Sequence, residues 1–348
     1  MISKIGNFSI INRNNSKNNQ TKRYYFNNSC ASDTVSFGNA SPILKAMLEK
    51  ENNASSNVEI VSDFGIRLLK NVDKLNYDTL KVEIQKFLKT NNIDNIQIKN
   101  LSEHPDKNVR TLAAGCFNPD INDDLTGLRS GVLYIGDIPK NIKNKEVATA
   151  YIAFVCHELT HAMQYAKDNS NFGFDGEINS IEEANKIFTL TNNLKPRIVP
   201  EIQQGLLMSF GKDHEKFGLS RMQLEKLIRI TNECQMPIFD KGVKISDAFI
   251  LSAISPTISL AKKVDAIVEA TTNGYIRYNN VPKEKEASIK KALLKRYIFE
   301  FKTEAEAYNV ACEIIKKQYN IQGDCVYSMI PRAYKMIEEA LISKLSEY

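Results

Sequence analysis

Residues 147 to 167 form the segment that most restricts how this chain of 348 residues can fold. The segment contains neither glycine nor proline, and at about 3.6 residues per turn it is long enough for five or more turns of α-helix. Apolar residues occupy every side of that helix, which is typical of a helix buried all round. Two histidines and a glutamate nevertheless lie within it, at His157, Glu158 and His161. Such groups are costly to bury unless they are hydrogen-bonded or coordinated, so the segment predicts a specific polar site inside the core.

The spacing of these three residues favours a metal site. Residues four apart share one face of a helix, so His157 and His161 can bind one ion about 2.0 to 2.1 Å from each nitrogen, with Glu158 beside it. In this arrangement the ion, typically Zn²⁺, lowers the pKa of a bound water towards roughly 7, and the glutamate carries the water's proton to a leaving amine. The alternative is a pair of hydrogen-bonded core histidines beside a surface Glu158. The metal site is favoured because the chain has four histidines and two of them have this spacing.

The motif and its context resemble the zincin metallopeptidases. The resemblance covers about residues 112 to 167 and one later helix, in the order strand, loop, strand and motif helix. It implies a zinc-dependent endopeptidase that acts on a protein or peptide, with Glu158 as the catalytic residue. In zincins the strand before the motif helix, here residues 131 to 135, commonly lines the cleft and pairs with an extended substrate.

The third metal ligand distinguishes the zincin branches. Metzincins have a histidine six residues after the second motif histidine, where this chain has Lys167. The two remaining histidines, His104 and His214, lie in polar or charged stretches, and we expect both at the surface. A carboxylate ligand, as in the gluzincin branch, is therefore expected.

Glu304 is the best candidate for that carboxylate. On a helix through residues 301 to 315 it lies near the centre of the apolar arc, whereas Glu306 lies almost opposite, on the polar face. A carboxylate in a buried face needs a partner, which is either a metal ion or a basic side chain. The string from Glu304 to Ala307 also resembles the ExxA helix with which several gluzincin families supply their third ligand.

Glu182 and Glu183 are the rival ligands. They follow His161 by about twenty residues, a spacing that resembles the thermolysin-like pattern. That pattern also requires an aspartate four residues after the ligand, and neither Lys186 nor Ile187 provides it. Glu182 faces away from the apolar side of its helix and Glu183 only flanks that side, so both are weaker candidates than Glu304.

A peptidase also stabilises the negative oxygen of its tetrahedral intermediate, commonly with Tyr, His or Arg. Four residues are candidates for this role: Tyr275, Tyr278, Tyr308 and His214. The sequence does not distinguish among them.

The sequence predicts that the chain consists of three regions. Residues 1 to 40 are basic and rich in Asn and Ser, which predicts a flexible arm or, alternatively, a targeting segment. Residues 41 to 110 have mainly helical patterning with a short strand near their end. Residues 111 to 348 would form the zincin-like domain, with strands within 112 to 117 and 131 to 135, the motif helix and a mostly helical C-terminal half. We therefore expect an α+β fold with a small sheet.

Charge and hydropathy exclude several classes of protein. The net charge of +5 comes from the first 28 residues, and the rest of the chain has equal numbers of basic and acidic residues, so no nucleic-acid partner is expected. No membrane span and no Sec signal peptide are predicted, which favours a cytoplasmic protein or one exported by a non-Sec route. The six cysteines form no CxxC pair and are expected to be buried thiols in a reducing compartment.

Two further expectations complete the prediction. Basic residues from Lys283 to Arg296 alternate with Glu284 and Glu286, which predicts a solvated helix face. The alternative function is a non-hydrolytic zinc-binding sensor or interaction protein on a zincin fold, and the presence of Glu158 argues against it. The sequence does not indicate the oligomeric state.

Overall fold

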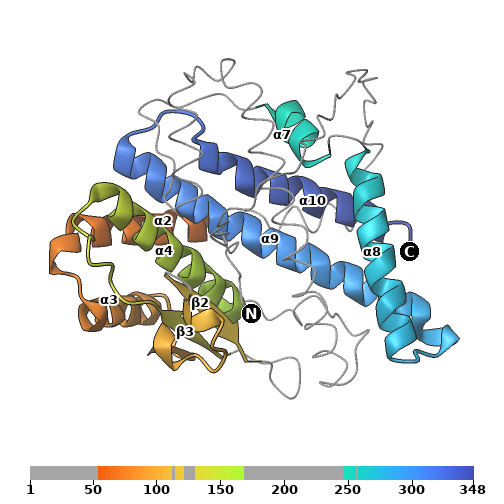
Figure 1. Cartoon of the computed structure of the whole chain (residues 1–348), viewed down its shortest axis with the longest axis horizontal. Helices are drawn as coiled ribbons and strands as arrows, with labels where there is room; N and C mark the ends of the chain where they lie inside the picture. The colour runs from red at the N-terminus through yellow and green to blue at the C-terminus, as the bar shows by residue number, and fades with distance from the viewer. Residues whose placement is uncertain (1–53, 112–113, 121–129, 168–245, 256–257) are drawn as a thin grey trace, which may run out of the picture.

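The computed structural model describes residues 54–111, 114–120, 130–167, 246–255 and 258–348. Within these residues the chain has an α+β fold that is mostly helical and contains one small sheet, which confirms the predicted fold class (Figure 1). The predicted arm at residues 1 to 40 lies outside the described residues. So do Glu182, Glu183 and His214.

The described α-helices are α2 (Ala54–Lys70), α3 (Tyr77–Thr90), α4 (Lys145–Lys167), α7 (Asp247–Ile254), α8 (Leu260–Tyr278), α9 (Glu286–Tyr319) and α10 (Met329–Leu345). The strands are β1 (Ile96–Asn100), β2 (Gly115–Pro119) and β3 (Gly131–Ile135). Short 3₁₀ helices lie at Val72–Lys74, Leu101–Glu103, Val109–Thr111, Lys283–Lys285 and Val326–Ser328.

The motif helix α4 begins where the sequence provides a cap. The side chain of Asn144 accepts hydrogen bonds from the backbone N–H groups of Glu146 at 2.8 Å and Val147 at 3.2 Å, which satisfies donors that the first helical turn leaves unpaired. From there α4 continues without a break through the motif to Lys167. The capped start therefore fixes the helix that carries His157 and His161.

The sheet has the strand order β1-β3-β2. Strand β3 lies in the centre, parallel to β1 and antiparallel to β2. The expectation from the zincin resemblance that residues 131 to 135 pair with an extended substrate is therefore wrong, because both edges of β3 are already paired within the described sheet. The outer strand next to α4 is β2.

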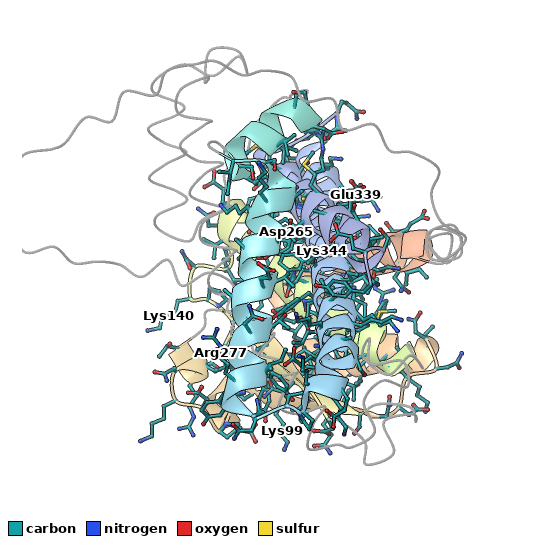
Figure 2. The ribbon with its side chains drawn as sticks, turned by 90° about the vertical axis from the view of Figure 1, so that its right-hand side faces the viewer. Lys99, Lys140, Asp265, Arg277, Glu339 and Lys344 are labelled. Atoms are coloured by element: carbon teal, nitrogen blue, oxygen red, sulfur yellow. The ribbon has the colours of Figure 1, made fainter. Side chains whose placement is uncertain are left out.

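Helix α4 packs against β2 and β3 on one side and against α2 and α9 on the others, so it is enclosed as predicted (Figure 1). The long helix α9 also packs against α10, and these helices share one hydrophobic core with the sheet. Helix α8 joins this assembly through an ion pair between Asp265 and Lys344 of α10, whose atoms lie 3.2 Å apart (Figure 2). The core thus holds α4 and α9 side by side.

Two predictions of surface residues are wrong. Arg296 is fully buried, because Glu300 one turn later on α9 supplies a counter-charge and Tyr165 of α4 lies 3.2 Å from its guanidinium. His104 is also buried, because its loop folds back onto the sheet. The His104 Nδ1 accepts a hydrogen bond from the backbone N–H of Asp106 at 3.0 Å, and its Nε2 lies 2.7 Å from the side-chain amide of Asn118 on β2.

Candidate metal centre

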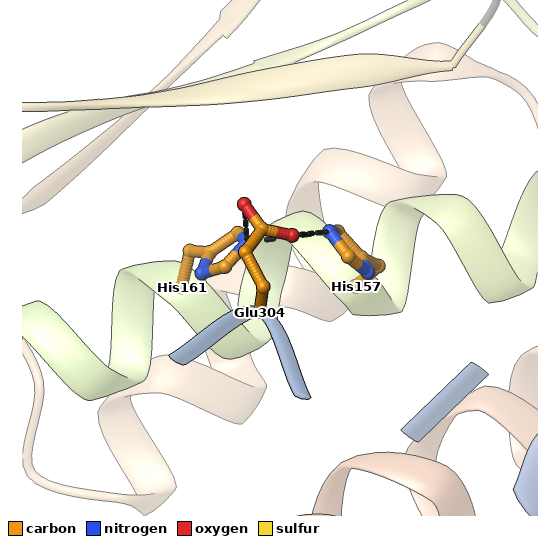
Figure 3. A group of neighbouring side chains, drawn as sticks. All are labelled: His157, His161 and Glu304. Atoms are coloured by element: carbon orange, nitrogen blue, oxygen red, sulfur yellow. Dashed lines mark hydrogen bonds and ion pairs between the residues drawn. The ribbon is translucent and has the colours of Figure 1, made fainter. Parts of the chain in front are cut away.

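Three ligand atoms converge between α4 and α9, where His157, His161 and Glu304 form one buried group (Figure 3). The two histidine Nε2 atoms lie 3.2 Å apart. The Glu304 Oε2 lies 3.5 Å from the Nε2 of His157, and its Oε1 lies 3.6 Å from the Nε2 of His161. The structure therefore brings together the three ligands that the sequence analysis favours.

The spacing of these atoms fits a metal ion. For ligands about 2.0 to 2.1 Å from a tetrahedral ion, neighbouring ligand atoms are about 3.3 to 3.4 Å apart, and the observed separations of 3.2, 3.5 and 3.6 Å are close to that value. All three side chains are also buried, each at most 4% exposed, so water does not separate them. Two imidazole nitrogens and a carboxylate that face one another in the core are stabilised either by a proton that they share or by a metal ion, and the spacing allows the metal ion.

Each ligand is placed by ordinary helix geometry. His157 and His161 are four residues apart on α4 and therefore project from one face. Glu304 comes from the middle of α9, where the packing against α4 buries it to 3% exposure. The ring of Tyr308, one turn after Glu304, makes an edge-to-face contact with His157, with ring centroids 4.6 Å apart. The site consequently depends on the register between two helices that are far apart in the sequence.

Gln164 and Glu306 also belong to the site, and neither role is predicted from the sequence. The Gln164 Oε1 lies 2.9 Å from the Nδ1 of His161, and the Gln164 Nε2 donates to the carbonyl of Thr303 at 3.0 Å and to Glu306 at 2.7 Å. The placement of Glu306 on the polar face is wrong, because its carboxylate points towards α4. Burial raises the pKa of Glu306, and hydrogen bonds from Gln164 and Asn57 oppose that rise. The position of Gln164, three residues after His161, was the one available sign that the two share a face.

Glu158 lies beside the metal group and contacts the sheet. Its Oε2 accepts a hydrogen bond from the backbone N–H of Phe117 on β2 at 2.9 Å. The side chain is buried, so the alternative of a surface Glu158 is excluded. The outer strand thus holds one oxygen of the carboxylate that the sequence predicts to be catalytic.

Of the three tyrosines considered for the oxyanion, Tyr308 lies at the site. Burial, together with the nearby Glu304 carboxylate, raises the pKa of Tyr308 well above its ordinary value, so its hydroxyl stays protonated near neutral pH. Tyr278 is 88% exposed on α8 and Tyr275 is buried on the same helix. Tyr308 contacts His157 of the metal group.

Fold and site define an α+β protein with a buried His–His–Glu group that can hold a metal ion. Comparison of the chain with models of known protein families, with curated proteins and with solved structures finds no match. Among the described helices, none combines the length and the apolar character needed to cross a membrane.

Proposed function

We propose that the protein is a zinc-dependent metallopeptidase of gluzincin type, with His157, His161 and Glu304 as zinc ligands and Glu158 as general base and acid. The observation that carries the proposal is the convergence of the three ligand atoms, all within 4.8 Å of one another, with Glu158 buried next to them. Two histidines and one glutamate, with a fourth position left for water, are a donor set typical of catalytic zinc. Zn²⁺ is therefore the metal proposed.

The residues around the group fit hydrolysis of a peptide bond. A bound zinc ion would supply Lewis-acid polarisation of the scissile carbonyl and of a water. Glu158 would accept the proton of that water and pass it to the leaving amine. The N–H of Phe117 holds Oε2 of Glu158 at 2.9 Å, so the carboxylate is oriented before substrate binds. Tyr308, whose hydroxyl stays protonated, would donate a hydrogen bond to the negative oxygen of the tetrahedral intermediate.

Metal analysis of purified wild type, His157→Ala and Glu304→Ala tests the metal site. We expect about one zinc per chain in the wild type and a large loss in both variants, because each removes one of three protein ligands. A folded wild type without metal after zinc has been supplied would overturn the proposal. Normal zinc binding by Glu304→Ala with loss in Glu183→Ala would move the third ligand to Glu183.

Cleavage of a dye-labelled unfolded protein tests the reaction. The zinc-loaded wild type should release labelled peptides, whereas zinc-loaded Glu158→Gln should not, since the amide cannot accept the proton. Zinc binding without cleavage of this substrate or of a mixed peptide library would contradict the peptidase and favour the non-hydrolytic sensor or interaction protein.

A further inference from the structure

The Gln164 side chain is held by several hydrogen bonds beside the metal group. It follows His161 by three residues on α4, is 7% exposed, and makes hydrogen bonds with His161, Thr303 and Glu306. Two of these partners belong to α9, on either side of Glu304 in the sequence. One amide therefore contacts both helices that supply the ligands.

The partners on α9 fix which way the amide points. The carbonyl of Thr303 can only accept a hydrogen bond, and the carboxylate of Glu306 accepts one as well. The atom of Gln164 that faces them must therefore be the NH₂ group. Its Oε1 is then left to face the Nδ1 of His161 at 2.9 Å.

This orientation in turn determines where His161 carries its proton. An amide oxygen can only accept, so the Nδ1 of His161 must donate, and the neutral ring then has an unprotonated Nε2. That nitrogen faces the Nε2 of His157 at 3.2 Å and Glu304 at 3.6 Å. Only the unprotonated nitrogen of an imidazole can bind a metal ion.

We propose that Gln164 is the positioning residue of this site: through Thr303 and Glu306 it holds His161 in the tautomer and ring orientation that present Nε2 to the metal. The inference rests on the proposed zinc site. It extends that proposal because Gln164 also joins His161 to the backbone of Thr303, next to Glu304. The Gln164 side chain therefore sets the tautomer of His161 and also the position of His161 relative to Glu304.

His157 provides an internal comparison. Its Nδ1 has no hydrogen-bond partner among the described residues, and its ring is held by packing against Tyr308. Loss of the Gln164 amide should therefore act directly on the tautomer of His161, and should reach His157 only through the contact between the two Nε2 atoms.

Nitrogen-15 NMR of the histidine rings at pH 8, in the metal-free protein, tests the tautomer without zinc or activity. The four histidines can be assigned by single substitutions. We expect His161 to carry its proton on Nδ1 in the wild type and to shift towards the Nε2–H form in Gln164→Met. A wild-type His161 protonated on Nε2 would overturn the inference.

Zinc affinity, measured by competition with a chromophoric chelator, tests the consequence. Gln164→Met should weaken binding about 10- to 100-fold, the usual effect of losing such an outer hydrogen bond. The matched control is Thr149→Val, which removes a buried hydroxyl of α4 that bonds to the carbonyl of Lys145, and it should bind zinc like the wild type. Equal affinities for Gln164→Met and the wild type would contradict the inference.

The exchange variant Gln164→Glu/Glu306→Gln covers the case in which Gln164→Met does not fold. It again places an acceptor beside the Nδ1 of His161 and a donor opposite residue 164, although the carbonyl of Thr303 loses its donor. We expect it to keep the Nδ1–H form of His161, and an Nε2–H form in this variant would count against the inference. A wild type that binds no zinc but shows the Nδ1–H form at His161 would refute the proposed function alone.

Discussion

The carboxylate of Glu158 accepts a hydrogen bond from the backbone N–H of Phe117, with 2.9 Å between the two atoms. Phe117 lies on the outer strand β2, and its neighbours Cys116 and Asn118 pair with Tyr134 and Val132 of β3. Alternate N–H groups of a strand point to opposite edges, so Phe117 directs its donor away from β3 and towards α4. The strand thereby holds the proposed general base in place.

Substitutions of Glu158 should separate this structural contact from catalysis. Glu158→Gln keeps an oxygen that accepts from Phe117, so its stability and zinc content should match the wild type, while peptidase turnover should fall about 100- to 10,000-fold. Glu158→Ala leaves the buried N–H of Phe117 without its acceptor and should lower the free energy of unfolding by about 1–3 kcal/mol relative to Glu158→Gln. Urea denaturation of both variants checks the difference, and equal stabilities would show that the contact contributes little.

Zinc should stabilise the folded protein, because the ligand group is assembled only when α4 and α9 are packed together. A ligand that binds the native state alone adds about 2.7 kcal/mol at a concentration 100 times its dissociation constant. We expect the urea midpoint of the wild type to rise with zinc and to fall with a chelator. His157→Ala should show neither shift, and a chelator effect of equal size in this variant would mean that the ion binds elsewhere.

The sequence predicts the motif helix and the position of Glu304 because both depend on local periodicity. An unbroken apolar segment around His157 requires a buried helix, and Glu304 lies in the middle of an apolar arc whose burial follows from its spacing alone. The strand pair β2 and β3 is also local, since a short connection joins them. Strand β2 separates β1 from β3 in the sequence, so local patterning does not show that β1 pairs with β3, the strand expected to pair with substrate.

The polar residues that are wrongly predicted at the surface share one physical property. Arg296 and His104 are buried and Glu306 is half-buried, and each contacts a polar partner from a distant segment or a folded-back loop. A polar side chain in a sequence is expected at the surface unless its partner is known. The position of such a partner is set by tertiary packing, so local patterning cannot reveal it.

The buried ion pair between Arg296 and Glu300 should be costly to break. Arg296→Met leaves the Glu300 carboxylate in the core without its cation, and we expect a loss of about 3–5 kcal/mol in the free energy of unfolding. Arg296→Met/Glu300→Gln should recover part of this loss, because no unpaired charge remains. Lys283→Met, at an exposed position, is the control and should change stability by less than about 0.5 kcal/mol. Urea denaturation measures all three, and a double variant no more stable than Arg296→Met would contradict this account.

Gly65 allows the close approach of α2 to α4 and α9. A Cβ at this position would lie 2.5 Å from Cδ1 of Ile314 and 3.1 Å from Sγ of Cys156, and both neighbours are fully buried. Gly65→Ala should destabilise the protein by about 1–3 kcal/mol through overpacking, although alanine is the better helix former by about 0.8–1.0 kcal/mol. Ile314→Val removes the nearest atom, so Gly65→Ala should cost less in that background. Additive effects in this double-mutant cycle, measured by urea denaturation, would show that Ile314 is not the obstacle.

The thiol pair of Cys312 and Cys325 should make stability depend on pH. A hydrogen bond from Cys312 lowers the pKa of Cys325 from its ordinary 9.0 to about 6. Burial opposes this shift, and hydrogen bonds from Ser328 and from the backbone N–H of Tyr327 add to it. Between these values the unfolded chain binds a proton that the folded chain has released, so the free energy of unfolding rises with pH. This contribution is complete above pH 9 and is lost as the pH falls through 6.

Absorbance of the thiolate near 240 nm, followed from pH 5 to 10, provides the direct measurement. The wild type should show one thiolate titrating near pH 6, and Cys312→Ala should move that titration to higher pH because the main stabilising hydrogen bond is gone. In Cys325→Ser the low-pH titration should be absent, and the gap in unfolding free energy between wild type and this variant should narrow from pH 9 to pH 6. Burial without such hydrogen bonds raises the pKa of a thiol, as it raises that of Cys116 to about 12. A wild-type titration at pH 9 or above that Cys312→Ala leaves unchanged would therefore show that Cys312 does not lower the pKa of Cys325.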